Sequence, residues 1–177
     1  MNIGWRLIIW QQFGAAIDML DDALRACPEE LWRECVWDDP SERPEYSQFW
    51  FVVYHTLYWL DLYLAGTADG FAPPQRFRQA EKGPDGVLPK MPYTREDLQA
   101  YLHECRHKCQ ATIEALTDET ARRVCRFEWI GDELSFVELQ LYSMRHVQEH
   151  TAQLNLLLGQ KVGSAPDWVS RARSAVA

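Results

Sequence analysis

The chain has 177 residues, a length that suits one domain of ordinary size, and 47% of them are hydrophobic, enough for a sizeable core. Its 18 basic and 26 acidic residues give a formal net charge of −8, which repels phosphate backbones and argues against nucleic acid as a partner. No run of about 18 apolar residues without charges occurs, so we expect no membrane span. These totals predict a single domain over residues 1–177.

The cysteines and the first residues of the chain bear on its compartment. The five cysteines are an odd number without the spacing of a disulfide framework, which argues for reduced thiols. The first residues lack the charged start, the apolar stretch and the small-residue cleavage site of a secretory signal. We therefore expect a cytoplasmic protein.

Four long stretches have the apolar periodicity of helices, and breaks that contain proline or glycine separate them. The first covers residues 4–26, and Pro28 prevents it from continuing. The second covers residues 45–64, and Gly66 is a suitable C-terminal stop. Each stretch is long enough to bury one apolar stripe against neighbouring helices.

The third stretch covers residues 95–116 and follows a threonine that can cap its N-terminus. The fourth covers residues 136–158, with Gly159 as its expected stop. Ser135 and Glu138 have the spacing of a capping box, in which each side chain bonds the backbone of the other. The four stretches predict an all-α protein, a four-helix bundle with a long loop between helices 2 and 3.

The connecting segments leave less regular structure to predict. At most a short strand or turn is expected around residues 126–130. The connection over residues 65–93 is long for a compact domain, where loops usually run to about 6 residues, and it holds Pro73, Pro74, Pro84, Pro89 and Pro92. We expect it to act as a lid or to contain a short helix. The tail after Gln160 is expected to pack back through Trp168.

His146 and His150 lie four residues apart on the fourth helix, about 40° apart around its axis, so both imidazoles can reach one metal ion. The pair falls at the centre of the stripe that faces the core, where a bundle should be apolar. An unpartnered buried polar group costs about 1–3 kcal/mol, so several together call for a ligand. The inward row consists of Leu139, Ser143, His146, His150, Gln153 and Leu157.

His55 occupies the same kind of position on the second helix, in a stripe that is otherwise almost entirely aromatic or aliphatic. A single core histidine can be satisfied by a backbone carbonyl or a buried water, which is the simpler interpretation of any one of the three. Three histidines at stripe centres favour the other interpretation. We predict that His55, His146 and His150 bind one divalent metal.

Two rival motifs are less well supported, one because of its geometry and the other because a ligand is missing. His103, Cys105, His107 and Cys109 resemble a metal cluster, but on a helix the thiols lie about 200° from the imidazoles, so the histidines are expected in solvent and the thiols in the core. The pattern H-x-x-E-H, completed by Glu149, is that of inverted zinc peptidases. No later glutamate is present to act as the third ligand, which argues against a peptidase.

The sequence resembles the DinB-like family of metal-dependent four-helix-bundle enzymes. The resemblance rests on the central histidine of Val53-Tyr-His55-Thr-Leu, on His146-Val-Gln-Glu-His150-Thr-Ala-Gln-Leu, and on the long loop after the second helix. It implies that His55, His146 and His150 are the family's metal triad, with none of them substituted. Relatives with known activities resemble transferases and isomerases that use low-molecular-weight thiols. The resemblance indicates the site more securely than the reaction, so no catalytic or thiol-binding residue is assigned.

Three neutral imidazoles leave a coordination position open and suit zinc, nickel or iron(II). Our first hypothesis is therefore a hydrolase or thiol-dependent transferase that acts on a small molecule, with the metal activating a water or a low-molecular-weight thiol. Gln153 and Ser143 are expected beside the metal ligands or the substrate. Tyr58, Trp59 and Tyr142 are candidates to line the pocket. Because ligating imidazoles must be neutral, metal occupancy is expected to fall below about pH 6.

Two alternatives stay open. One is a non-catalytic metal- or ligand-binding bundle, in which the metal is structural or the histidines bind a small ligand. The other is a metal-free interaction module whose surplus of aromatic residues forms a dimer interface. Bundles with broad apolar faces often pair, so a homodimer is expected in any case.

Overall fold

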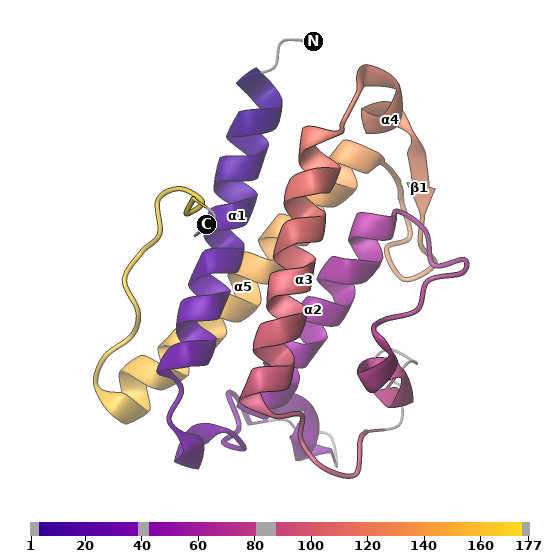
Figure 1. Ribbon diagram of the computed structural model, residues 1–177. Coiled ribbons are helices and arrows are strands. Elements are labelled where there is room, and N and C mark those ends of the chain that lie inside the picture. The colour runs from indigo at the N-terminus through magenta and orange to yellow at the C-terminus, as the bar shows by residue number, and fades with distance from the viewer. Residues whose placement is uncertain (1–3, 39–42, 81–87, 175–177) are drawn as a thin grey trace.

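Four long helices dominate the computed structural model, which describes residues 4–38, 43–80 and 88–174 (Figure 1). Helix α1 packs against α3 and α5, and α2 packs against the same two helices. In cross-section α1 therefore lies diagonally opposite α2, and the apolar stripes of all four meet in one core. The predicted four-helix bundle is confirmed. The helices are α1 (Gly4–Ala26), α2 (Phe49–Ala65), α3 (Arg95–Glu114) and α5 (Phe136–Val162).

Most helix ends follow the predicted capping chemistry. The Thr94 hydroxyl accepts a hydrogen bond from the backbone N–H of Asp97 at 3.2 Å, and Ser135 and Glu138 form the expected capping box. Gly66 ends α2 in the left-handed conformation, with φ of 73°. The local sequence alone therefore determines these three boundaries.

The predicted end of the fourth helix is wrong. Helix α5 continues through Gly159 to Val162 and ends at Gly163, which takes the left-handed conformation with φ of 81°. Lys161 in the added turn donates to the carboxylate of Glu34 at 2.6 Å. A glycine inside a helix costs only about 1 kcal/mol, so a second glycine further along can serve as the stop.

The start of α2 also differs from its predicted position at residue 45. A short 3-10 turn, η2 (Pro44–Ser47), comes first, and Gln48 is extended with ψ of 145°. Gln48 makes an isolated antiparallel bridge to Cys35. This pairing with the segment after α1, which contains the 3-10 turn η1 (Glu29–Leu31), prevents Gln48 from being helical and delays the helix to Phe49.

A small hairpin separates α3 from α5 (Figure 1). It follows the short helix α4 (Asp118–Arg122) and pairs β1 (Val124–Arg126) with β2 (Glu133–Ser135) in antiparallel register. The turn expected near residues 126–130 is present, and the strands lie on either side of it. The hairpin turn lies beside the C-terminal half of α2, where Trp129 donates to the Tyr63 hydroxyl at 3.1 Å.

The long connection after α2 contains a short 3-10 helix, η3 (Gln75–Ala80), so the expectation of a local helix is confirmed. Phe77 in it is 1% exposed and stacks on Tyr101 of α3 with ring centroids 4.5 Å apart. Residues 81–87 of the connection lie outside the described residues. A lid function for residues 65–93 stays a prediction. Across the described ranges, no helix has the length and apolar character needed to span a membrane.

The C-terminal tail runs back from the end of α5 along α1 (Figure 1). The tail was expected to pack through Trp168, but Trp168 is 71% exposed and this expectation is wrong. Ala172 makes the contact instead: its backbone N–H donates to the carbonyl of Gln11 in α1 at 2.8 Å. Ala172 packs so closely against Gly14 of α1 that a Cβ atom added to that glycine would lie 2.5 Å from the Cβ of Ala172.

Candidate metal centre

The three predicted histidines meet where α2 and α5 pack. His55 projects from the middle of α2, and His146 and His150 project from successive turns of α5. The Nε2 atoms of His55 and His146 are 3.2 Å apart, and those of His146 and His150 are 3.1 Å apart. Within the described ranges, this is the one set of three or more histidine, cysteine or acidic residues whose ligand atoms all lie within 4.8 Å of one another.

The spacing of these nitrogens fits a metal ion. Zinc binds imidazole nitrogen at about 2.0–2.1 Å, and a tetrahedral angle then places two ligating nitrogens about 3.3 Å apart. The two measured separations, 3.2 Å and 3.1 Å, are close to that value. All three side chains are partly exposed, so the centre is not sealed off from solvent. The cluster can therefore hold a metal with an open position.

Gln153 orients one of the rings. Its side-chain Oε1 lies 2.8 Å from Nδ1 of His150. An amide oxygen can only accept, so the hydrogen of His150 resides on Nδ1 and the lone pair of Nε2 faces the centre. Metal-bound histidines usually have such an acceptor behind them, which fixes the ring and strengthens the ligand. Gln153 therefore lies beside His150, one of the three predicted ligands.

Trp59 has the opposite effect on the tautomer of His55 from the effect of Gln153 on His150. Its indole Nε1–H donates to Nδ1 of His55 at 3.2 Å, which leaves the hydrogen of a neutral His55 ring on Nε2, toward His146. Nε2 of His146 then accepts a hydrogen bond from Nε2–H of His55. Nε2 of His150 receives no hydrogen bond from either of the other two rings. Ligation by all three Nε2 atoms requires the Trp59 indole to release His55.

His146 and Ser143 carry polar atoms without partners. Nδ1 of His146 and Oγ of Ser143 are buried and have no hydrogen bond among the described residues. The two residues are three positions apart on α5 and so lie on the same face of the helix. Orphaned buried polar groups usually mark a place for water, an ion or a ligand.

Burial controls the protonation of the rings. Desolvation, followed by the neighbouring imidazoles, holds the pKa of His55 well below its usual 6.5. The same causes lower the pKa of His146 to about 3, and desolvation lowers the pKa of His150. All three rings are therefore neutral at pH 7, which is the form that binds a metal.

These shifts predict how the metal-free protein responds to acid. A histidine whose pKa is lower when folded takes up its proton first in the unfolded chain, so stability is full above about pH 6.5 and is lost as the pH falls toward 3. Urea denaturation in chelator at about pH 7.5 and about pH 4.5 measures the loss. His146→Leu should show a smaller loss than the wild type, and an equal loss would contradict this assignment.

Aromatic side chains surround the centre. Trp59 meets the His55 ring edge-on, with centroids 6.1 Å apart, and Tyr142 is 36% exposed beside Tyr63. Tyr58 is buried, and its ring packs edge-on against Trp59. Trp129 also borders the centre, although it was not among the residues predicted to line the pocket. It comes from the hairpin turn, lies 5.1 Å from Trp59, and is half exposed.

The rival motifs lie where their helical spacing predicts. His103 and His107 are exposed, and Cys105 and Cys109 are buried in the core. Glu149 points to solvent, so it is not placed as a general base at the centre. All five cysteines are free thiols.

The fold and the site define a four-helix bundle with a three-histidine centre between its second and last long helices. The sequence matches the DinB superfamily over residues 12–154, and the chain belongs to that superfamily. The matched range includes all three histidines and stops before the C-terminal tail. Comparisons with curated proteins and with solved structures gave no match to this chain.

Proposed function

We propose that this protein is a metal-dependent enzyme that acts on a small molecule, with His55, His146 and His150 as the ligands of one divalent ion. The observation that carries the proposal is the convergence of three imidazole Nε2 atoms from two helices, with separations of 3.2 Å and 3.1 Å, where α2 and α5 pack. Membership of the DinB superfamily supports the same conclusion. Imidazole donors suit zinc, nickel or iron(II).

The reaction class follows from the open position. Three protein ligands are typical of catalytic centres, whereas structural zinc sites usually have four. A divalent ion held there would lower the pKa of a bound water or thiol toward neutrality. We propose a hydrolase or a thiol-dependent transferase, the latter using a low-molecular-weight thiol.

The surrounding residues have separable roles in this proposal. Gln153 keeps the His150 lone pair directed at the centre through the 2.8 Å bond to Nδ1. The Ser143 hydroxyl, buried and unpaired on the same face of α5, is placed to hold a polar atom of the substrate or a bound water. Trp59 and Tyr142 offer flat apolar surface for the rest of the substrate.

Acid should remove the metal, at a lower pH than the sequence alone indicates. The ordinary pKa of histidine by itself predicts that the metal is lost below about pH 6. Burial lowers the pKa of all three rings, so protons compete with the metal only in more acidic solution. We expect metal to be retained at about pH 5 and lost toward pH 3, as measured by dialysis and elemental analysis. Loss complete at about pH 6 would contradict neutral buried ligands.

Cobalt substitution tests whether the centre is catalytic. The protein, purified without a histidine tag, is loaded with Co(II), and its visible spectrum is recorded while a small thiol such as 2-mercaptoethanol is added. A new sulfur-to-cobalt band would support an open position that accepts thiols. A spectrum that changes with pH and not with thiol would favour a water-activating hydrolase.

The same experiment also tests the alternative that the metal is structural and the protein is not an enzyme. If neither thiol nor pH changes the spectrum, while chelator sharply lowers the melting temperature, the ion is structural and the enzymatic proposal fails. The homodimer is also a proposal at this point, and sedimentation equilibrium of the full chain tests it separately.

A further inference from the structure

The last part of the tail contacts the bundle through its main chain. We call residues 170–173 the C-terminal segment; it lies outside the region matched to the superfamily, residues 12–154. The side chain of Gln12 donates to the carbonyl of Ser170 at 3.2 Å, and the N–H of Ala172 donates to the carbonyl of Gln11 at 2.8 Å. Main-chain contacts of this kind are how proteins bind extended peptides.

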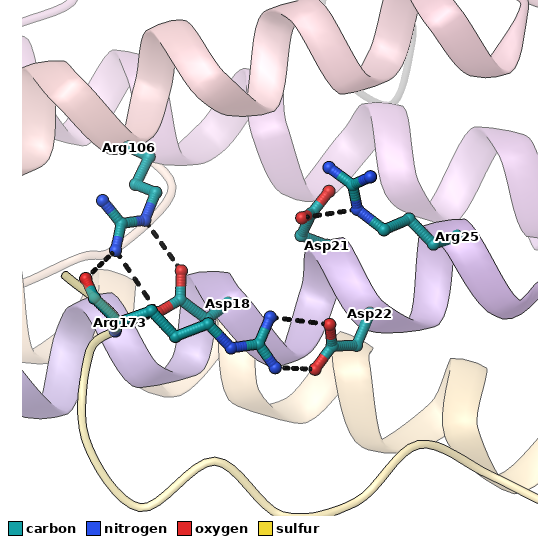
Figure 2. Close-up of polar contacts among 6 residues, drawn as sticks. All are labelled: Asp18, Asp21, Asp22, Arg25, Arg106 and Arg173. Carbon is teal, nitrogen blue, oxygen red and sulfur yellow. Dashed lines mark hydrogen bonds and ion pairs between the residues drawn. The ribbon is translucent and has the colours of Figure 1, made fainter. Parts of the chain in front are cut away.

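A buried ion pair supplies the next contacts (Figure 2). Asp18 of α1 is 4% exposed and accepts hydrogen bonds from Arg106 of α3 at 2.7 Å and 3.3 Å. Asp18 also accepts the backbone N–H of Arg173 at 2.6 Å, and Arg106 donates to the carbonyl of Arg173 at 2.7 Å. Both main-chain polar groups of Arg173 are therefore bound by one buried pair that bridges two helices.

A notch on α1 holds the side chain of Ala172. A Cβ atom added at Gly14 would lie 2.5 Å from the Cβ of Ala172 and 3.0 Å from the Trp10 ring. Gly14 has an ordinary helical backbone, since its φ is not positive. A side chain at position 14 would therefore meet both Ala172 and the Trp10 ring of the same helix, and the contact with Ala172 is the closer of the two.

The arginine side chain adds a surface contact. The Arg173 guanidinium forms two bonds with the carboxylate of Asp22, one of them at 2.8 Å (Figure 2). The Arg173 side chain is 50% exposed and that of Asp22 is 21% exposed, so solvent weakens the pair. The Arg173–Asp22 pair favours arginine at this position of the segment. Most of the contact with the bundle is made by the main chain and by the Ala172 methyl group.

The stretch between α5 and the C-terminal segment is held less closely. Residues 164–169 are mostly exposed and form no helix or strand, and Gly163 at their start is left-handed. They border a hollow of about 570 Å³ that is also lined by Asp22, Arg25 and Val162. The tail is therefore held to the bundle at residues 170–173, and the exposed residues 164–169 connect this contact to the end of α5.

From these contacts we propose that the α1–α3 face is a peptide-binding surface whose ligand is the chain's own residues 170–173. The C-terminal segment opens and closes on this surface as a clasp while the four long helices stay folded. The surface recognises a small residue through the Gly14 notch and the following arginine through the carboxylate of Asp22, while Asp18 and Arg106 bind the main chain. The proposal is independent of the metal centre, because the histidines lie on α2 and α5.

Hydrogen exchange on the full chain tests the clasp, with a matched pair of variants. Arg173→Ala removes the Asp22 contact, and Arg171→Ala is the control, since Arg171 is exposed and makes no hydrogen bond or ion pair among the described residues. We expect exchange at the amides of Ala172 and Arg173 to quicken several-fold in Arg173→Ala and to stay unchanged in Arg171→Ala. Equal behaviour of the two variants would overturn the proposal.

A double-mutant cycle tests the notch. Glycine to alanine inside a helix ordinarily stabilises it, but Gly14→Ala should push out Ala172 and speed exchange at residues 172 and 173 by about tenfold or more, as expected for losing a hydrogen bond to a charged group. Gly14→Ala with Ala172→Gly should restore slow exchange. No change in Gly14→Ala, or faster exchange in all four helices together, would show that the segment is not a separable clasp.

Discussion

His146→Ala should weaken zinc binding by about a hundredfold or more, because it removes the ligand that lies between the other two. Nε2 of His146 is 3.2 Å from that of His55 and 3.1 Å from that of His150. Among the described residues the cluster has only these three histidines, so the variant keeps two of the three predicted nitrogen ligands. Titration against a chromophoric chelator measures the affinity. The same titration, repeated with nickel and iron(II), ranks the candidate metals.

His103→Ala is the matched control for this measurement. His103 is an exposed histidine on α3, far from the α2–α5 contact, and its loss changes the histidine count without touching the centre. Wild-type affinity in His103→Ala, together with the loss in His146→Ala, is the expected result. An equal, small effect of both variants would mean that zinc binds to surface histidines.

Asp18→Ala should destabilise the protein by about 3–5 kcal/mol, because it leaves the largely buried guanidinium of Arg106 without its carboxylate partner. The Arg106 side chain is 12% exposed and that of Asp18 is 6% exposed, so water has little access to the place of the lost carboxylate. The Arg106 guanidinium also lies 5.2 Å from the Trp10 ring, which holds it in place. Urea denaturation at neutral pH measures the difference in free energy of unfolding.

Asp22→Ala is the control for the buried pair. Asp22 contacts Arg173 at the surface, and such exposed pairs are worth about 0–1 kcal/mol. The loss in Asp22→Ala should therefore be several times smaller than in Asp18→Ala. Similar losses in the two variants would contradict the view that burial makes the Asp18–Arg106 pair important.

Local patterns were enough to predict the helices and most of their ends. The cap at Thr94 and the box of Ser135 and Glu138 act within one turn, so they can be recognised in the sequence. Gly159 shows where this fails. Two glycines four residues apart, Gly159 and Gly163, are both plausible stops, and a contact to distant Glu34 accompanies the longer helix.

The candidate site was predictable because its residues break a pattern. His55, His146 and His150 are polar residues at the centres of apolar stripes, and helical spacing alone places each of them toward the core. Trp129 was not predictable in this way. It lies in a turn without periodicity, and only the tertiary placement of the hairpin brings it within 5.1 Å of Trp59.

The contacts of the C-terminal segment could not be predicted from the sequence either. Asp18 and Arg106 lie 88 positions apart in the chain and meet only because α1 packs against α3. The bulkiest residue of the tail, Trp168, was the natural candidate for an anchor, yet Ala172 occupies the notch at Gly14. The fit of Ala172 into this notch depends on its shape, which the pattern of hydrophobic residues along the sequence does not reveal.

Anomalous scattering from crystals of the untagged protein, collected across the zinc, nickel and iron edges, tests the central claim most directly. The proposed centre predicts one peak about 2.0–2.1 Å from Nε2 of each of His55, His146 and His150, with a further position open to solvent. Crystals grown with added zinc that show no peak among these three rings, or rings turned away from one another, would contradict it.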